Sequence, residues 1–114
     1  MADPKYVTRT IGDGSVSISE EVIATIAKEA LSRVDGVKLS GAAIKNMRGI
    51  KVKITDDKIT VDSIIYVIYG QSVMDTAAKA QAEIAEAVGA MTGLTVDAVN
   101  VTVNGIAPNA TSVK

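Results

Sequence analysis

The sequence has 114 residues, of which 12 are lysine or arginine and 13 are aspartate or glutamate, so its formal net charge is −1. This length suits one domain around a single hydrophobic core. The near-zero net charge gives no general attraction for an anionic partner. The chain contains neither cysteine nor histidine, which excludes disulfides, thiolate metal sites and the usual general base of enzymes. The composition therefore weighs against an enzyme.

The amino-terminal segment, residues 1–14, is predicted to be a flexible arm, because it is polar and ends in the turn sequence Gly12-Asp13-Gly14. Met1–Thr10 lacks the apolar segment of a signal peptide. The longest apolar run, Ile64–Tyr69, is far shorter than the roughly 18 residues of a membrane span. We therefore expect a cytoplasmic protein without a transmembrane segment of its own.

A short strand over Ser15–Ile18 and a helix from Ser19 to about Val34 are expected next. Ser19 can cap the helix, and two glutamates follow it, where negative charge complements the helix dipole. The apolar residues of this helix recur at spacings of three and four, which predicts one buried stripe. The stripe consists of Ile23, Ile26, Ala27, Ala30, Leu31 and Val34. Asp35-Gly36 should end the helix.

The middle of the chain is predicted to form a hairpin. Val37–Leu39 is interpreted as a brief strand, and residues 40–49 as a loop bounded by glycine. Apolar residues at 50, 52 and 54 then alternate with lysines, which indicates a strand with one buried face. Thr55–Lys58 consists of turn-forming residues that connect this strand to the next one.

The longest predicted strand is Ile59–Tyr69. Alternate side chains leave a strand on opposite faces, so its odd-numbered apolar residues are predicted to face the helices: Ile59, Val61, Ile65, Val67 and Tyr69. The other face then carries three large side chains, Ile64, Tyr66 and Ile68, which form a candidate docking or self-association surface. Its expected polar rim consists of Thr60, Asp62, Asn100 and Thr102. Two alternatives remain: a terminal segment covers this face, or β-propensity alone explains these residues.

An amphipathic helix over Ser72–Thr92, which Gly93 ends, is predicted to follow. Its buried stripe is expected to contain Val73, Ala77, Ala80, Ile84, Ala87, Val88 and Met91. Valines then alternate with polar residues over Val96–Asn104, which predicts a last strand. The connection is long enough for this strand to lie parallel to Ile59–Tyr69. Residues 108–114 are predicted to be a flexible tail.

These elements predict a single α/β (α+β) domain over residues 15–107. Both helices should pack on one face of a three- to four-stranded mixed β-sheet, as a two-layer sandwich. The other sheet face would meet solvent or a partner.

One segment has a marked excess of positive charge. Between Asp35 and Asp56 the chain has no acid but five basic residues: Lys38, Lys45, Arg48, Lys51 and Lys53. One interpretation is a small nucleic-acid or anionic-surface binding module. The alternative is a solvated strand edge that lysines protect against pairing. The chain has no phenylalanine or tryptophan on which bases could stack, which weighs against nucleic acid.

Short motifs occur along the chain in a characteristic order. In the second half they are Tyr69-Gly70, Ser72-Val73, Gln81, Val88, Met91-Thr92-Gly93-Leu94, Val96, Val99-Asn100-Val101 and Gly105-Ile106. In the first half they are Gly14 to Ile18, Ser19, Val22-Ile23, Ile26-Ala27 and Val34-Asp35-Gly36-Val37. In this combination, which spans about Gly14–Ala107, the chain resembles the alkaline-shock and general-stress (Gls-type) envelope stress response proteins of Gram-positive bacteria. It departs from them at Glu20, where members often carry proline, and in its short 40–49 loop.

The resemblance implies a non-enzymatic interaction or scaffold protein in the cell-envelope stress response or homeostasis. It implies no cofactor. Some members are held at the membrane by a separate membrane-embedded partner, so a protein partner and a peripheral position at the cytoplasmic face of the membrane are expected. Homo-oligomerisation through Ile64, Tyr66 and Ile68 is a further expectation.

Overall fold

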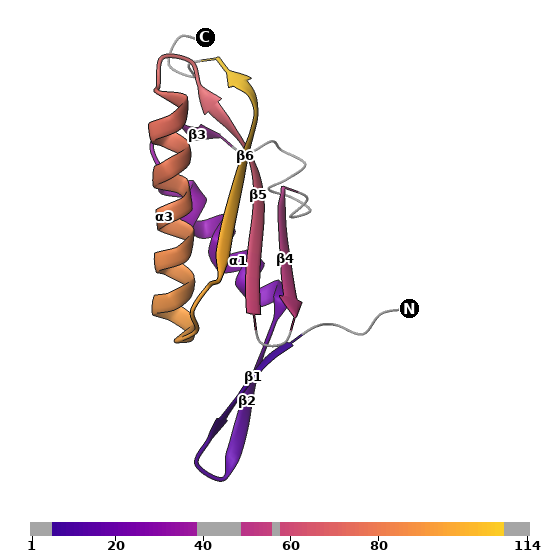
Figure 1. Cartoon of the computed structure of the whole chain (residues 1–114). Helices are drawn as coiled ribbons and strands as arrows, with labels where there is room; N and C mark the ends of the chain where they lie inside the picture. Colours follow the sequence, from indigo (N-terminus) through magenta and orange to yellow (C-terminus); the bar gives the residue numbers. More distant parts are fainter. Residues whose placement is uncertain (1–5, 39–48, 56–57, 109–114) are drawn as a thin grey trace.

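The computed structural model describes residues 6–38, 49–55 and 58–108. In chain order the elements are β1 (Tyr6–Ile11), β2 (Gly14–Ser19), α1 (Glu20–Ser32), β3 (Val37–Lys38), β4 (Ile50–Thr55), β5 (Lys58–Ile68), α3 (Val73–Thr92) and β6 (Ala98–Ala107) (Figure 1). This is the predicted α+β arrangement. The predicted turn at 56–57 and most of the predicted 40–49 loop and 108–114 tail fall outside the described residues.

Strand β5 is the centre of a four-stranded mixed sheet. β4 pairs antiparallel with the first half of β5, and β3 pairs antiparallel with it near Val67. β6 pairs parallel with β5 over Thr60–Ile68, which overlaps both of those stretches. A strand has only two edges, so β3 and β4 share one edge of β5 and β6 occupies the other. β4 and β6 therefore lie on opposite sides of β5, as Figure 1 shows.

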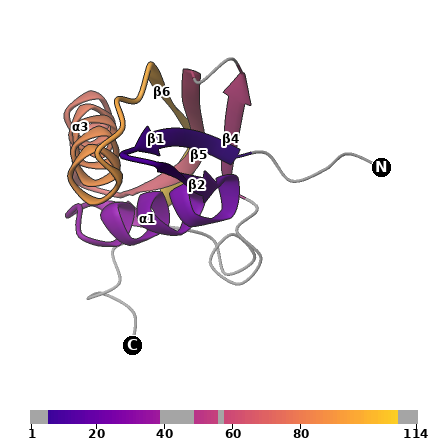
Figure 2. The same cartoon turned by 90° about the horizontal axis from the view of Figure 1, so that it is seen from below.

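Both helices begin, and α3 also ends, where their local sequences direct, whereas α1 ends at Ser32, two residues before the predicted Val34. The Ser19 hydroxyl accepts a hydrogen bond from the Val22 amide, and the Ser72 hydroxyl accepts one from the Asp75 amide. Gly93 ends α3 in the left-handed conformation, with φ of 74°, and its amide donates to the Gly89 carbonyl. Both helices pack on one face of the sheet and against each other (Figure 2). Neither helix in the described part of the chain is long and apolar enough to cross a membrane.

The core lies between the helices and one sheet face. All six residues of the predicted α1 stripe are buried, as are Ala80, Ile84 and Val88 of α3. Met91, in contrast, is 72% exposed and Val73 is also exposed, so the prediction was wrong for these two residues. They lie in the last and first turns of a helix about 30 Å long. Helical periodicity reports the direction of a side chain but not whether a neighbouring element reaches far enough to cover it.

The inward face of β5 follows the predicted alternation except at its end. Ile59, Val61, Ile65 and Val67 are buried, whereas Tyr69 is 73% exposed. β5 ends at Ile68 and the chain turns at Gly70, which has φ of 103°, so Tyr69 lies at the end of the sheet, where its side chain is left uncovered. The prediction for this tyrosine was wrong.

The predicted amino-terminal arm is also wrong where it falls on described residues. Tyr6–Ile11 is a strand, and it forms a two-stranded antiparallel hairpin with β2 that projects from the body of the molecule (Figure 1). Val7 lies opposite Ile18 and is 1% exposed, within the main core. The polar appearance of the segment comes from the other hairpin face, where the hydroxyls of Thr8 and Ser17 lie 2.9 Å apart. Residues 1–5 lie outside the described residues.

Candidate functional site

The sheet face that the helices leave uncovered, here called the open face, is the candidate site. Residues paired across adjacent strands point to the same side of a sheet. Lys51 lies opposite Asp62, and Ile64 has Thr102 as its parallel partner on β6. By the same register, the open face contains Lys38, Lys51, Lys53, Thr55, Lys58, Thr60, Asp62, Ile64, Tyr66, Ile68, Ala98, Asn100, Thr102, Gly105 and Ala107.

The apolar centre of the open face is the predicted trio on β5. Ile64 is 43% exposed, and Tyr66 and Ile68 are half-buried. The Tyr66 ring lies against Gly105, where an added Cβ would come within 3.0 Å of the ring carbon Cε2. The Asn104 amide donates to the Tyr66 hydroxyl across 3.3 Å. These two contacts hold the ring against β6.

A β-bulge in β6 creates this seat for the ring. Ile65 pairs with Val103, but Tyr66 pairs with Gly105, so Asn104 is the extra residue. The sequence offers Asn104-Gly105 as a signal for a local irregularity. It does not reveal that the irregularity faces Tyr66, because that depends on the register between two strands 38 residues apart.

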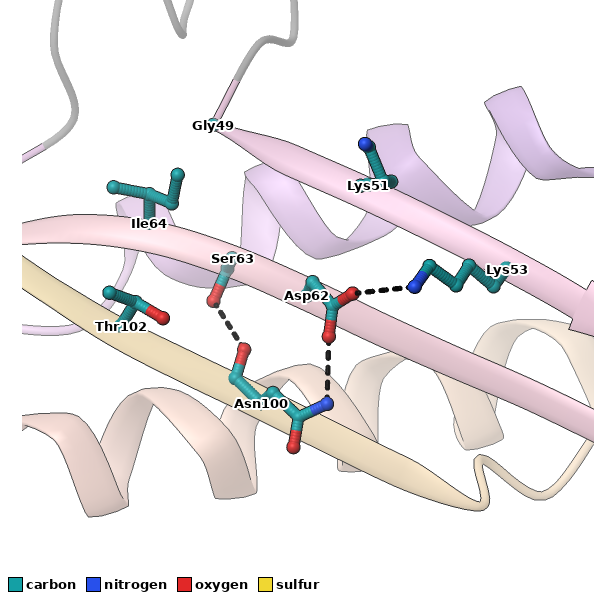
Figure 3. A pocket seen from close by; sticks show the side chains of 8 residues that line it. All are labelled: Gly49, Lys51, Lys53, Asp62, Ser63, Ile64, Asn100 and Thr102. Atoms are coloured by element: carbon teal, nitrogen blue, oxygen red, sulfur yellow. Dashed lines mark hydrogen bonds and ion pairs between the residues drawn. The ribbon is translucent and has the colours of Figure 1, made fainter.

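A polar group borders the apolar centre (Figure 3). Asp62 accepts a hydrogen bond of 2.7 Å from the Asn100 amide and lies 3.9 Å from the Lys53 ammonium. Lys53 is 65% exposed, so this ion pair contributes at most about 1 kcal/mol to stability. The Ser63 hydroxyl donates to the Asn100 carbonyl across 3.4 Å. The four predicted rim residues therefore lie on the open face, and two of them bond to each other.

These side chains surround a shallow depression of about 400 Å³. Its lining consists of Gly49, Lys51, Lys53, Asp62, Ser63, Ile64, Asn100 and Thr102 (Figure 3). Small-molecule pockets are usually concave and mainly apolar, whereas this one is open, contains charged side chains and is lined by residues of three strands. It is better suited to a side chain or peptide segment of a protein partner. Within the described ranges, no group of three acidic side chains is placed to hold a metal ion.

The basic segment and the apolar trio, which the sequence presents as separate features, meet on this face. Lys51 and Lys53 lie beside Asp62, and Lys38 is paired with Tyr66. Lys45 and Arg48 lie outside the described residues. Asp62 is the only acid that the described strands place on the open face. Most acids of the described residues lie instead on the helices: Glu20, Glu21, Glu29, Asp75, Glu83 and Glu86. The net charge of −1 conceals this separation.

Comparison with known proteins gives a consistent family. The model of the alkaline shock protein family, described as having a cell envelope-related function, matches residues 8–108. The uncharacterized protein YqhY of Bacillus subtilis (strain 168) is 35% identical over 104 residues, which cover 82% of this chain and 77% of that protein. The uncharacterized protein YloU of the same organism is 32% identical over 108 residues, covering 82% and 88%.

A streptococcal protein and a set of solved structures are also similar. The uncharacterized protein Spy1614 of Streptococcus pyogenes serotype M6 is 31% identical over 107 residues, covering 82% of this chain and 88% of that protein. A solved variant of MamM CTD is 23% identical, with a TM-score of 0.48, and covers 75% of this chain and 95% of that chain. A TM-score below 0.5 at this identity does not establish a shared fold.

Proposed function

Because this chain belongs to the alkaline shock protein family, whose function is cell envelope-related, we propose that it is a non-enzymatic scaffold protein of the cell-envelope stress response. In this proposal it docks a membrane-embedded protein partner on the open face of its sheet. The absence of cysteine and histidine from the chain supports a binding role rather than catalysis.

The observation that carries the proposal is the composition of the open face. Protein interfaces combine an apolar centre, often with an aromatic residue, and a polar rim. Here Ile64 and Tyr66 form the centre, and Asp62, Asn100 and Thr102 lie around it. Tyr66 is already fixed against Gly105, so it loses little side-chain freedom when a partner binds.

The charge of the open face supports an orientation in which this face is turned toward the cytoplasmic side of the membrane. Lys38, Lys51 and Lys53 lie along one side of the apolar centre, on β3 and β4, and Asp62 is the single acid that the described strands place on this face. The cytoplasmic leaflet is negatively charged, and lysines near its surface each contribute about 1 kcal/mol of attraction. The open face would therefore be oriented toward the membrane while it binds the cytoplasmic part of the partner.

The test is the share of the protein that is recovered with membranes from cells that naturally produce it. Replacing Ile64 with aspartate should weaken docking by about 2 kcal/mol, or roughly 30-fold in affinity, because it places a charge in the centre of the interface. The protein should then shift from the membrane fraction to the soluble fraction. Ile11→Asp is the matched control, since Ile11 is an exposed isoleucine of a strand outside the four-stranded sheet.

Two results would contradict the proposal. One is a wild-type protein that is absent from the membrane fraction. The other is an Ile64→Asp protein that stays with the membranes as fully as wild type while its circular dichroism spectrum confirms that it is folded.

The second candidate function is binding of a polyanion, such as RNA, by the lysines of the open face. We expect Lys51→Glu with Lys53→Glu to abolish any retention of the protein on heparin. Retention of the wild type should fall with salt, because each phosphate contact contributes about −0.7 to −0.9 to the slope of log affinity against log salt. The control is Lys28→Glu with Lys79→Glu, which changes the net charge equally but on the helices. If wild type is not retained at low salt, or if both pairs act equally, the open face has no such role.

A further inference from the structure

The outer edge of β6 differs from every other edge of the sheet. β6 is ten residues long, and among the described residues it pairs only with β5. An unpaired edge presents backbone amides and carbonyls that can pair with another chain, and proteins usually protect such edges with lysine or other charges. β4, on the opposite side of β5, carries Lys51 and Lys53. β6 carries no charged residue at all.

The bulge limits how much of this edge can pair. Because Asn104 interrupts the register, the regular part of β6 is Ala98–Val103. Its valines face the helices, and Asn100 and Thr102 face the open side. A six-residue stretch that is polar but uncharged on one face and apolar on the other is suited to strand addition.

The flank of α3 beside this edge is also uncharged. The Gln81 side chain donates a 2.8 Å hydrogen bond to the Val99 carbonyl, which identifies the flank that faces β6. Helical spacing places three more exposed residues on this flank, namely Met74, Ala78 and Ala85. The charged residues of α3 lie on its other side: Asp75, Lys79, Glu83 and Glu86.

A continuous uncharged surface of strand and helix favours one occupant in particular, a second copy of the chain. A two-fold axis brings each surface against its own copy, so any charge near the axis would meet a like charge. In this chain 22% of the residues are charged, but this surface carries no charge. Two identical surfaces can therefore meet at the axis without repulsion between like charges. We propose that two copies pair antiparallel through β6, so that one sheet continues across both.

The two faces of the sheet determine which residues of the two β6 strands can lie opposite each other. Valines must remain under the helices, and a shift of one residue would turn them to the open side. The two-fold axis must therefore pass through a pair of identical residues, and we place it at Val101, which lies near the middle of the regular stretch. Val99 then lies opposite the partner's Val103, and Asn100 lies opposite the partner's Thr102. The two open faces then lie side by side, which would give a partner protein two adjacent docking sites.

Chemical cross-linking tests this arrangement. The wild-type chain has no cysteine, so a single introduced cysteine can be linked only to another copy. In the dimer the two Thr102 positions lie within about 10 Å, whereas the two Lys53 positions are separated by five inter-strand spacings, or roughly 24 Å. A short bismaleimide should therefore give a covalent dimer with Thr102→Cys and not with Lys53→Cys, which is an exposed residue on the same face.

Sedimentation of proteins that lack cysteine provides an independent measurement. Wild type should have twice the 11.8 kDa mass of one chain, and Thr102→Lys should reduce it to the mass of one chain. Thr55→Lys, the same change on the opposite edge strand, should remain dimeric. A monomeric wild type, equal cross-linking at positions 102 and 53, or a Thr102→Lys protein that dimerises as strongly as wild type would overturn the proposal.

The inference is independent of docking on the open face. Ile64→Asp should leave the dimer intact even where it releases the protein from membranes. If Ile64→Asp instead converts the dimer to a monomer, self-association occurs through the open face and not through β6.

Discussion

Replacing Ile84 with alanine is expected to lower the free energy of unfolding by about 2–5 kcal/mol. Ile84 is fully buried in the middle of α3 and belongs to the cluster that joins both helices to the sheet. Alanine removes three carbon atoms and leaves a cavity that the neighbouring side chains fill only in part. Since small domains are stable by only about 5–15 kcal/mol, the loss should move the urea midpoint strongly.

Met91→Ala is the matched control for this prediction. Both residues lie on α3, and helical spacing assigns both to its apolar stripe, but Met91 is 72% exposed. Its replacement should change the free energy of unfolding by less than about 0.5 kcal/mol. Urea titrations followed by circular dichroism compare the two proteins directly. Similar losses for both would mean that the last turn of α3 is covered, contrary to the structure.

Replacing Val7 with alanine is expected to cost about 2 kcal/mol, although the sequence assigns this residue to a flexible arm. Val7 is buried at the base of the β1–β2 hairpin, opposite Ile18. Removing two buried methyl groups costs roughly 1.6 kcal/mol in transfer free energy, and the cavity adds to this. Thermal and urea unfolding should both report the loss.

Ile11→Ala is the control, because Ile11 lies on the same strand and hairpin face but is 64% exposed near the tip. Its replacement should have little effect on unfolding. A Val7→Ala protein as stable as Ile11→Ala would show that the hairpin base does not pack into the core, and the arm interpretation would be restored.

The candidate site was predictable in its parts but not as a surface. Strand alternation alone places Ile64, Tyr66 and Ile68 on one face, and charge counting alone finds the basic segment. Their meeting on the open face depends on the pairing of Lys51 with Asp62 and of Lys38 with Tyr66. Register between strands is a long-range property that depends on turn geometry and on the fit of whole faces. The uncharged edge of β6 likewise becomes meaningful only once β6 is known to be an edge strand.

The sequence by itself determined the elements whose causes are local. Ser19 and Ser72 cap the helices, Gly93 ends α3, and the α1 stripe is buried as its spacing predicts, because caps, turns and periodicity act within a few residues. Only the tertiary structure decided which ends are covered, as Met91, Tyr69 and Val7 show. Burial depends on what another element places over a side chain, and no local pattern contains that information.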